Sequence, residues 1–278
     1  MDKYLVLANN DKDIDLALSK KTVEYIENKG ARACIVSDVI NDYDGTDIKE
    51  EYISDAKAVI VIGGDGTMLR AAAGIGSHKV PLLGINLGTI GFLTEVEVSN
   101  LYEALDRLMA GDYTLEKRMM IDGTFENKTY TSLNDVVITR AGFSRIIGLN
   151  IYVNDELLDT YEADGVIVAT PTGSTGYNLS AGGPIVSPKS NAIVVTPISP
   201  HSLTTKSIVF DSKDIIKIEI IKKRKTQETE AIVSFDGSNN RELSAGDTIT
   251  VKKSEKIIEL IKLYDLNFYR VLRDKIGG

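Results

Sequence analysis

The chain is poor in cysteine and in basic side chains, and it has no long apolar run. A single cysteine, Cys34, argues against an internal disulfide framework. The chain holds 32 basic against 40 acidic side chains, which argues against nucleic-acid binding because that binding depends on neutralising phosphates. No apolar run approaches the ~18 residues of a membrane span, and Tyr4–Ala8 is too short for a signal peptide. We therefore expect a soluble, cytoplasmic, globular protein without nucleic-acid or membrane partners.

The 278 residues are enough for one large domain or for two ordinary ones of roughly 150 residues. Charge divides them unevenly, since residues 1–118 hold 20 acidic and 13 basic side chains, whereas residues 119–278 hold 20 and 19. The pattern of apolar residues changes near the same position. We therefore predict an α/β domain over 1–118, a β-rich domain over 119–263 and a C-terminal segment over 264–278.

The first part of the chain alternates between strand-like and helix-like segments. Short runs that are apolar throughout predict buried strands at 4–8, 33–36, 58–62 and 81–85. Helices are expected over about 13–29, with a stop at Gly30, and from near Asn100 to Gly111, with Glu103 placed for a capping box. Such alternation predicts an open, mostly parallel sheet covered by helices on both sides.

The second part is dominated by short segments rich in Val, Ile or Thr. Turn residues such as Asn154-Asp155 and Asp236-Gly237 separate most of them, as in an all-β layered sheet. The expected strands are 120–125, 132–139, 149–153, 165–170, 192–196, 214–221, 231–235, 248–252 and 257–263. Residues 267–273 are expected to form a helix that packs back on the first domain.

A glycine-rich loop, Gly63-Gly64-Asp65-Gly66-Thr67, directly follows the strand 58–62 and precedes a helix-like segment. Ligands bind outside the carboxyl ends of strands in open α/β sheets. Glycine backbone and a helix N-terminus suit a phosphate there. The Asp65 carboxylate would repel a phosphate bound in this loop, so it needs a role of its own. It could hold Mg²⁺ or accept a proton from an attacking hydroxyl. The alternative is a tight turn in which Asp65 caps the helix.

Two further motifs are weaker alone. Thr170-Pro171-Thr172-Gly173-Ser174-Thr175-Gly176-Tyr177 offers five hydroxyl groups suited to a nucleoside, and Tyr177 adds an aromatic face. It lacks the lysine of a Walker-type phosphate loop, and an ordinary turn between strands is the alternative. The pair Asn134-Asp135 at the start of an apolar strand is typical of a strand-entry turn.

Taken together and in this order, these motifs resemble the bacterial NAD kinases, which make NADP with ATP or polyphosphate. Asn86-Leu87-Gly88, Gly91-Phe92-Leu93-Thr94 and Pro197–Leu203 also match, and the resemblance spans roughly residues 1–263. It implies an α/β domain followed by a layered β domain. It also implies transfer of the terminal phosphoryl of ATP, or of polyphosphate, to the adenosine ribose 2′-hydroxyl of NAD.

The resemblance also implies roles for individual residues. Asp65 would accept the proton of the ribose hydroxyl, and Phe92 would line the adenosine end. The implied nucleotide-binding residues are Gly63, Gly64, Gly66, Thr67, Phe92, Asn134, Asp135, Arg145, Asp164, Thr172, Thr175, Gly176, Tyr177, Asn178 and Ser180. No side chain is assigned to a resident metal, and Mg²⁺ is expected to accompany ATP. Relatives assemble as dimers or tetramers, so a homo-oligomer is expected.

The sequence departs from the family pattern at four places. Asp135 stands where relatives usually carry Glu, and Gly176 where many carry Ala. Glu162 replaces a frequent Arg, for which Arg145 is a possible substitute, and Lys206-Ser207 replaces an Arg-Pro pair.

Two other functions compete with a dinucleotide kinase. A lipid kinase of the wider superfamily would need an apolar groove or a membrane-binding face, and no basic amphipathic helix is evident. A dinucleotide sensor without catalytic activity would gain nothing from a carboxylate among phosphates.

Overall fold

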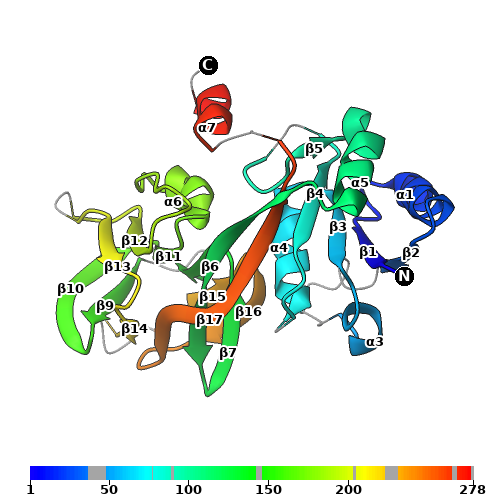
Figure 1. Ribbon diagram of the computed structural model, residues 1–278. Helices are drawn as coiled ribbons and strands as arrows, with labels where there is room; N and C mark the ends of the chain where they lie inside the picture. Colours follow the sequence, from blue (N-terminus) through cyan, green and yellow to red (C-terminus); the bar gives the residue numbers. More distant parts are fainter. Residues whose placement is uncertain are drawn as a thin grey trace. The chain divides into compact units, whose positions relative to one another are not determined.

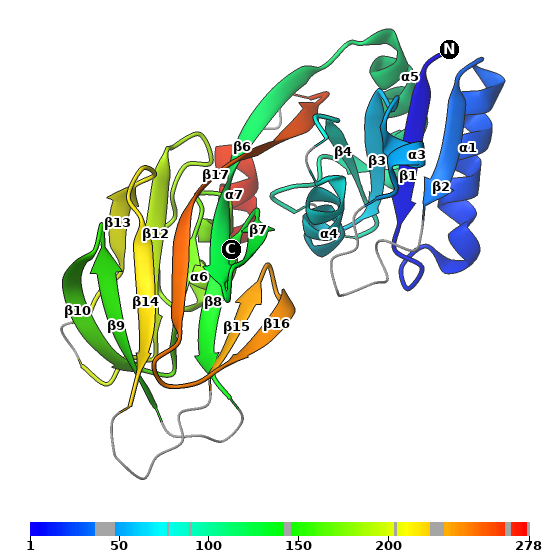
Figure 2. The ribbon, with the colours of Figure 1, turned by 90° about the horizontal axis from the view of Figure 1, so that it is seen from below.

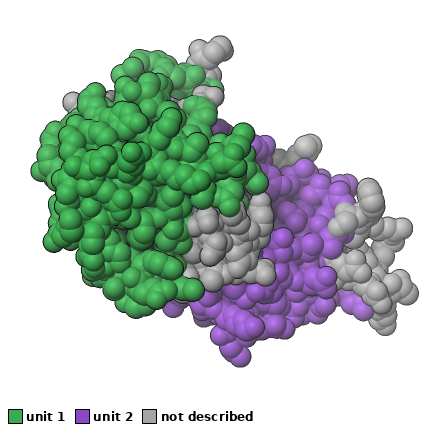
Figure 3. All heavy atoms as spheres, turned by 90° about the vertical axis from the view of Figure 1, so that its right-hand side faces the viewer, with its two compact units in different colours: residues 1–118, 258–278 green, residues 119–257 purple. Residues whose placement is uncertain are grey.

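The computed structural model describes residues 1–36, 48–76, 78–88, 91–141, 146–202, 205–222, 231–264 and 268–276. By their contacts these residues form two compact units (Figure 3). Unit 1 comprises residues 1–118 and 258–278, and unit 2 comprises residues 119–257. The α/β class expected for the first part and the antiparallel β class of the second are both confirmed. No helix in the described part of the chain is long and apolar enough to cross a membrane.

Unit 1 contains a parallel sheet in the order β4-β3-β1-β2 (Figure 1). Its strands are β1 (Lys3–Ala8), β2 (Arg32–Val36), β3 (Ala58–Gly63), β4 (Leu82–Asn86) and the short β5 (Val96–Glu97). Its helices are η1 (Ile14–Leu16), α1 (Ala17–Asn28), α3 (Glu50–Ile53), α4 (Asp65–Ile75), η2 (Val98–Asn100), α5 (Leu101–Ala110) and α7 (Phe268–Ile276). All four predicted strands and both predicted helices of this part are therefore present.

Helices cover both faces of this sheet, as its uniformly apolar strands require (Figure 2). On one face, Ile26 of α1 and Leu105 of α5 share a core cluster with Leu83 and Ile85 of β4. Gly84 lies between Leu83 and Ile85 and faces the opposite side of the sheet, because successive residues of a strand point to alternate faces. A Cβ on Gly84 would lie 3.0 Å from Sδ of Met68, so α4 packs on the opposite face.

The helix boundaries correct two sequence expectations. Helix α1 begins at Ala17 rather than near residue 13, because Asp15 and Leu16 both have φ of +55° and interrupt the helical path. The capping box predicted at Asn100 and Glu103 is wrong, since no side-chain cap hydrogen bond forms there and the 3-10 turn η2 leads directly into α5. Gly30 and Gly111 end their helices with positive φ, as predicted.

Unit 2 is built from two layers of strands with an apolar core cluster between them. The first layer is an antiparallel sheet in the order β13-β12-β11-β8-β15-β16, and the second contains the antiparallel run β10-β9-β14-β17 together with β6 and β7. The strands are β6 (Thr114–Phe125), β7 (Lys128–Ser132), β8 (Asp135–Arg140), β9 (Ile147–Val153), β10 (Glu156–Ala163), β11 (Gly165–Ala169), β12 (Ala192–Ile198), β13 (Ile208–Asp211), β14 (Ile216–Ile221), β15 (Ala231–Phe235), β16 (Ser238–Leu243) and β17 (Thr248–Lys262). Two short helices, η3 (Gly173–Thr175) and α6 (Tyr177–Ser180), interrupt the strands.

Strand boundaries in this part differ from the sequence expectation at two places. The strands predicted at 248–252 and 257–263 are one continuous strand, β17, because the polar residues between them keep an extended backbone, with Lys253, Glu255 and Lys256 exposed and only Ser254 buried. The strand predicted at 132–139 is divided at Leu133-Asn134, which separates β7 from β8. The turns predicted at Asn154-Asp155 and Asp236-Gly237 are confirmed by positive φ at both positions of each.

Candidate functional site

Three loops of unit 1 lie at the carboxyl edge of its sheet. Strands β1, β3 and β4 are parallel neighbours, so the loops that follow them meet at one edge. The glycine-rich loop joins β3 to α4, and the loop after β4 is fastened to it by the N–H of Leu87, which donates to the carbonyl of Gly63 at 3.1 Å. This arrangement places Asp65 beside residues 91–93.

The Asp65 carboxylate accepts hydrogen bonds from the loop after β4. Its Oδ2 accepts the N–H of Phe92 at 2.8 Å, and its Oδ1 accepts the N–H of Leu93 at 3.1 Å. Asp65 is half-buried and is the first residue of α4, whose N-cap position is occupied by Gly64. The helix-capping alternative is therefore wrong. Of the first N–H groups of α4, that of Thr67 donates to the carbonyl of Gly64 at 2.9 Å, whereas those of Asp65 and Gly66 have no acceptor within the helix.

Two glycines are required here because neighbouring groups approach too closely for a side chain. A Cβ on Gly63 would lie 2.2 Å from Oγ1 of Thr67, and a Cβ on Gly91 would lie 1.9 Å from Oδ1 of Asp65. Gly66 is exposed, and a Cβ there would meet no atom of the described residues within 4 Å. Gly63 and Gly91 thus shape the loops, whereas Gly66 keeps backbone accessible.

Thr67 and Phe92 have different surroundings. Thr67 is 1% exposed, and its hydroxyl has no hydrogen-bond partner among the described residues. The half-buried ring of Phe92 packs against Phe268 of α7 with 5.8 Å between ring centroids, and Nζ of Lys275 lies 5.8 Å from the Phe92 ring. The backbone of Phe92 therefore holds Asp65 while its ring contacts the C-terminal helix.

In unit 2, the Thr170–Ser180 segment forms a rigid turn rather than a row of free hydroxyl groups. The hydroxyl of Thr170 donates to the carbonyl of Leu133 at 2.6 Å and accepts the N–H of Gly173 at 3.0 Å. The hydroxyl of Ser174 donates to the carbonyl of Pro171 at 2.7 Å. These two buried hydroxyl groups hold the loop, which corrects the expectation that all five are available to a nucleoside.

The outward face of this segment consists of a few residues. Thr175 and Gly176 are partly exposed, and Tyr177 and Ser180 are exposed. Asn178 is fully buried, its Nδ2 donates to the carbonyls of Ser174 and Pro184, and its Oδ1 accepts the Thr196 hydroxyl at 2.6 Å. Asn178 therefore fixes the loop from inside, and Thr172, which is 5% exposed, also lies on the inner side.

Asp236 organises the Asn134-Asp135 pair, and sequence reasoning missed it. Its carboxylate accepts three backbone N–H groups, from Leu133 at 2.7 Å, Asn134 at 2.8 Å and Asp135 at 3.0 Å. The only sequence signal was the Asp236-Gly237 turn, about a hundred residues away, and a turn aspartate does not reveal a distant partner.

Asp135 and Asp236 also affect each other's protonation. Burial, and to a smaller extent the charge of the neighbouring Asp236, together raise the pKa of Asp135 to about 7. Burial raises the pKa of Asp236 to about 6, opposed by the three N–H groups that stabilise its ionised form. Near neutral pH the pair is therefore readily protonated on one of its two carboxyl groups.

Asn134 joins the pair to the loop. Its carbonyl accepts the N–H of Thr170 at 2.8 Å, and a Cβ on Gly173 would lie 2.1 Å from the same oxygen, so only glycine fits. Its Oδ1 is buried without a hydrogen-bond partner among the described residues. A buried acceptor without a donor is costly. Asn134 thus offers an acceptor to a bound donor group.

Asp164 lies apart from this cluster in the same chain. Asp164 precedes β11 and Thr170 follows it, so six residue steps of about 3.4 Å each separate the two residues by roughly 20 Å. Its carboxylate pairs with Nε of Arg140 at 2.8 Å. Arg145, the other basic residue predicted here, lies outside the described residues.

No group of three or more His, Cys, Asp or Glu side chains within the described ranges is arranged to hold a metal ion. Asp65, the carboxylate nearest the glycine loop, is already bound by two N–H groups. The described residues thus contain no ready-made cluster of metal ligands.

Family models match most of the chain. The ATP-NAD kinase N-terminal domain matches residues 5–113, and the ATP-NAD kinase C-terminal domain matches residues 133–263.

Individual proteins agree with these matches. The NAD kinase of Lachnoclostridium phytofermentans is 44% identical, covering 100% of this chain and 99% of that protein, and the NAD kinase of Caldanaerobacter subterraneus is 40% identical over 99% of both. The crystal structure of yeast NADH kinase complexed with NADH has a TM-score of 0.83 at 23% identity, covering 100% of this chain and 88% of that one. An Archaeoglobus fulgidus NAD kinase in complex with ATP has a TM-score of 0.78 at 24% identity, covering 99% and 98%. The chain therefore belongs to the NAD kinase family.

Proposed function

We propose that this NAD kinase transfers the terminal phosphoryl of ATP, or of polyphosphate, to the adenosine ribose 2′-hydroxyl of NAD, with Asp65 as the general base. The observation that carries the role of Asp65 is its pair of hydrogen bonds from Phe92 and Leu93. They orient the carboxylate without using it as a helix cap, at the sheet edge where open α/β folds bind ligands. A carboxylate oxygen has lone pairs left to accept a proton.

Phosphoryl transfer depends mainly on positioning and on stabilising charge. In the proposed reaction the 2′-oxygen of the ribose bonds to the terminal phosphorus, and the bond from that phosphorus to the bridging oxygen breaks, releasing ADP. The hydroxyl proton passes to Asp65. Backbone at Gly64 and Gly66 and the N-terminus of α4 are proposed to contact the donor phosphates, as helix N-termini do. Gly63 and Thr67 support this loop.

The residues of unit 2 are proposed to hold the dinucleotide. The exposed face of Thr175, Gly176, Tyr177 and Ser180 offers hydroxyl groups, open backbone and an aromatic ring. Asn134 supplies an unpaired acceptor, and Asp135 a carboxyl group that holds a proton near neutral pH. Phe92, Asp164 and Arg145 keep their proposed nucleotide-binding roles from the family pattern, and Thr172 and Asn178 support the loop.

Mg²⁺ is proposed to enter as the complex with ATP, as part of the substrate. Mg²⁺ in kinases is commonly held by substrate phosphates and one or two carboxylates rather than by a cage of side chains. The lack of a three-ligand cluster among the described residues agrees with this proposal.

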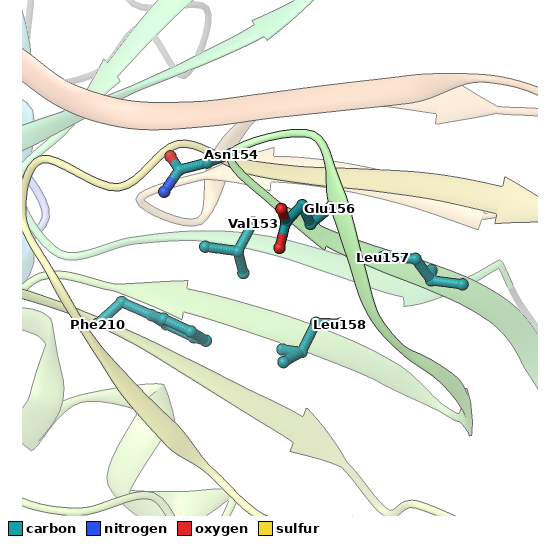
Figure 4. Close-up of a pocket in the computed structure, with 6 residues that line it drawn as sticks. All are labelled: Val153, Asn154, Glu156, Leu157, Leu158 and Phe210. Carbon is teal, nitrogen blue, oxygen red and sulfur yellow. The ribbon is translucent and has the colours of Figure 1, made fainter.

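We also propose that the chain acts in the cytoplasm, where ATP and NAD are both supplied, and that it assembles as a dimer or tetramer. Exposed apolar side chains at two sheet edges of unit 2 support assembly. Leu158 and Phe210 line a hollow beside the β9–β10 hairpin, together with Val153 and Leu157 (Figure 4). Leu157 is 57% exposed, and β10 is an edge strand. Light scattering after size-exclusion chromatography measures the assembly.

Asp65→Asn tests the base assignment. We expect kcat to fall by about 10²–10⁴-fold, the usual contribution of general-base catalysis, with NAD affinity nearly unchanged. NADP formation from ATP, Mg²⁺ and NAD, coupled to an NADP-specific dehydrogenase, measures kcat, and calorimetry measures NAD binding. Near-normal turnover of this variant would contradict the assignment.

Gly91→Ala gives a second test with the carboxylate intact. The new Cβ would overlap Oδ1 of Asp65 and displace it, so we expect a comparable loss of kcat. Gly88→Ala is the matched control, because a Cβ there meets none of the described residues within 4 Å, and its activity should match the wild type.

A further inference from the structure

The loop after β1 lies beside the glycine-rich loop and is held in one conformation. Asn9, which is 6% exposed, donates its N–H to the carbonyl of Ile62 at the end of β3 at 3.4 Å. The carbonyl of Asn9 accepts the N–H groups of Lys12 at 3.0 Å and Asp13 at 2.8 Å, and its Oδ1 accepts the N–H of Asp11. The backbone of Lys12 is therefore tied to β3, the strand that leads into the glycine loop.

The residue after Lys12 fixes the other end of this loop. Asp13 is 4% exposed, and its carboxylate accepts the N–H of Leu18 and the N–H of Ser19, both at 2.9 Å. These bonds join the loop to the first turn of α1. Lys12 thus extends from a backbone that is anchored on both sides.

The ammonium group of Lys12 lies over the glycine loop. A Cβ built on Gly64 would be 3.4 Å from Nζ of Lys12, so the charge is beside the backbone that leads into α4. Nζ has no ion-pair or hydrogen-bond partner within the part of the chain that the structure describes, whereas Lys3, Lys29 and Lys57 are paired with carboxylates. A cation next to a helix N-terminus and next to glycine backbone suits an anion.

We propose that Lys12 binds the phosphates of the donor nucleotide; the inference rests on the proposed kinase reaction. A Lys ammonium next to phosphate oxygens forms charge-assisted hydrogen bonds. Within the described residues Lys12 forms no ion pair with Asp65, whose carboxylate accepts the N–H groups of Phe92 and Leu93. Lys12 also supplies positive charge to a segment, residues 1–118, in which acidic side chains outnumber basic ones. Sequence motifs do not reveal it, because it lies in a polar loop fifty residues from the glycine loop.

The test compares Lys12→Ala, Lys12→Arg and the control Lys21→Ala, which removes an exposed lysine of α1. NADP formation is measured while ATP and NAD are varied separately. We expect Lys12→Ala to raise the KM for ATP by about 10-fold or more, the effect of a charged hydrogen bond, and to leave the KM for NAD unchanged. Lys12→Arg should recover most of the loss, and Lys21→Ala should match the wild type.

Direct binding of ATP separates this inference from the proposed reaction. Calorimetry with Mg²⁺ and ATP, without NAD, should show about 10-fold weaker binding for Lys12→Ala than for the wild type. This readout holds even if the wild type makes no NADP, a result that would defeat the proposed reaction alone. Unchanged ATP affinity and unchanged KM for ATP in Lys12→Ala, with the same melting temperature as the wild type, would overturn the role of Lys12.

Discussion

Asp135 and Asp236 are neighbouring aspartates with different roles in the fold. The Asp236 carboxylate accepts three N–H groups and therefore positions the start of β8. The Asp135 carboxyl is buried next to that charge, which favours its protonated form. The strand-entry turn expected from Asn134-Asp135 is present, but its organising partner comes from the β15–β16 turn.

The difference predicts opposite results for two matched substitutions. Because the pKa of folded Asp135 is raised from 3.8 to about 7, its contribution to stability is full below pH 4 and is lost as pH rises toward 7. Each unit of that shift corresponds to about 1.4 kcal/mol. Asp135→Asn should therefore increase the free energy of unfolding at pH 8 and reduce its decline between pH 4 and 7. Asp236→Asn should decrease the free energy of unfolding at both pH 5 and pH 8, since one amide oxygen cannot replace a carboxylate that accepts three N–H groups. Urea unfolding at pH 5 and pH 8 measures both, and a destabilised Asp135→Asn at pH 8 would contradict the explanation.

At the scale of elements, Glu95 fastens the end of β17 to the loop before β5 in unit 1. Its Oε1 accepts the N–H of Tyr264 at 2.8 Å, and its Oε2 lies 3.0 Å from Nζ of Lys262. The Glu95 side chain is 1% exposed and that of Lys262 is 18% exposed, so the pair is nearly removed from water. This contact lets β17 join the parallel sheet beside β4.

Removing one partner of a buried ion pair leaves the other charge uncompensated, whereas removing both does not. Glu95→Ala should therefore lower the free energy of unfolding by about 3 kcal/mol. The double variant Glu95→Gln with Lys262→Met should lose much less, because the amide oxygen still accepts the Tyr264 N–H. Urea unfolding of the single and double variants measures the coupling, and equal losses in both would show that the ion pair is not the cause.

At the scale of the whole molecule, unit 1 contains the glycine loop and Asp65, and unit 2 contains the Thr170–Ser180 segment. No cluster of three metal-binding side chains occurs within the described residues of either unit. We propose that the cation needed for transfer enters with the phosphates of ATP.

Metal removal should separate activity from stability. We expect a chelator such as EDTA to abolish NADP formation and added Mg²⁺ to restore it. Without nucleotide, the melting temperatures with and without EDTA should agree within about 1 °C. A metal that binds only together with ATP does not bind the nucleotide-free protein and therefore cannot stabilise it. A large fall in melting temperature with EDTA would indicate a resident metal.

The sequence by itself determined the class of each part and the positions of the chemical motifs. Runs that are apolar on both faces dictate buried parallel strands, and a strand followed by glycines and Asp65 dictates a loop at the sheet edge. These are local properties of consecutive residues, so they can be read without the fold.

Only the tertiary structure decided which groups those motifs meet. The N–H groups of Phe92 and Leu93 hold Asp65 from a loop that follows a different strand. Asp236 holds Asn134 across about a hundred residues, and Lys12 reaches Gly64 across fifty. Thr170, Ser174 and Asn178 are turned inward by hydrogen bonds that their composition does not reveal. The physical reason is that such contacts depend on strand order and register, which bring distant residues together.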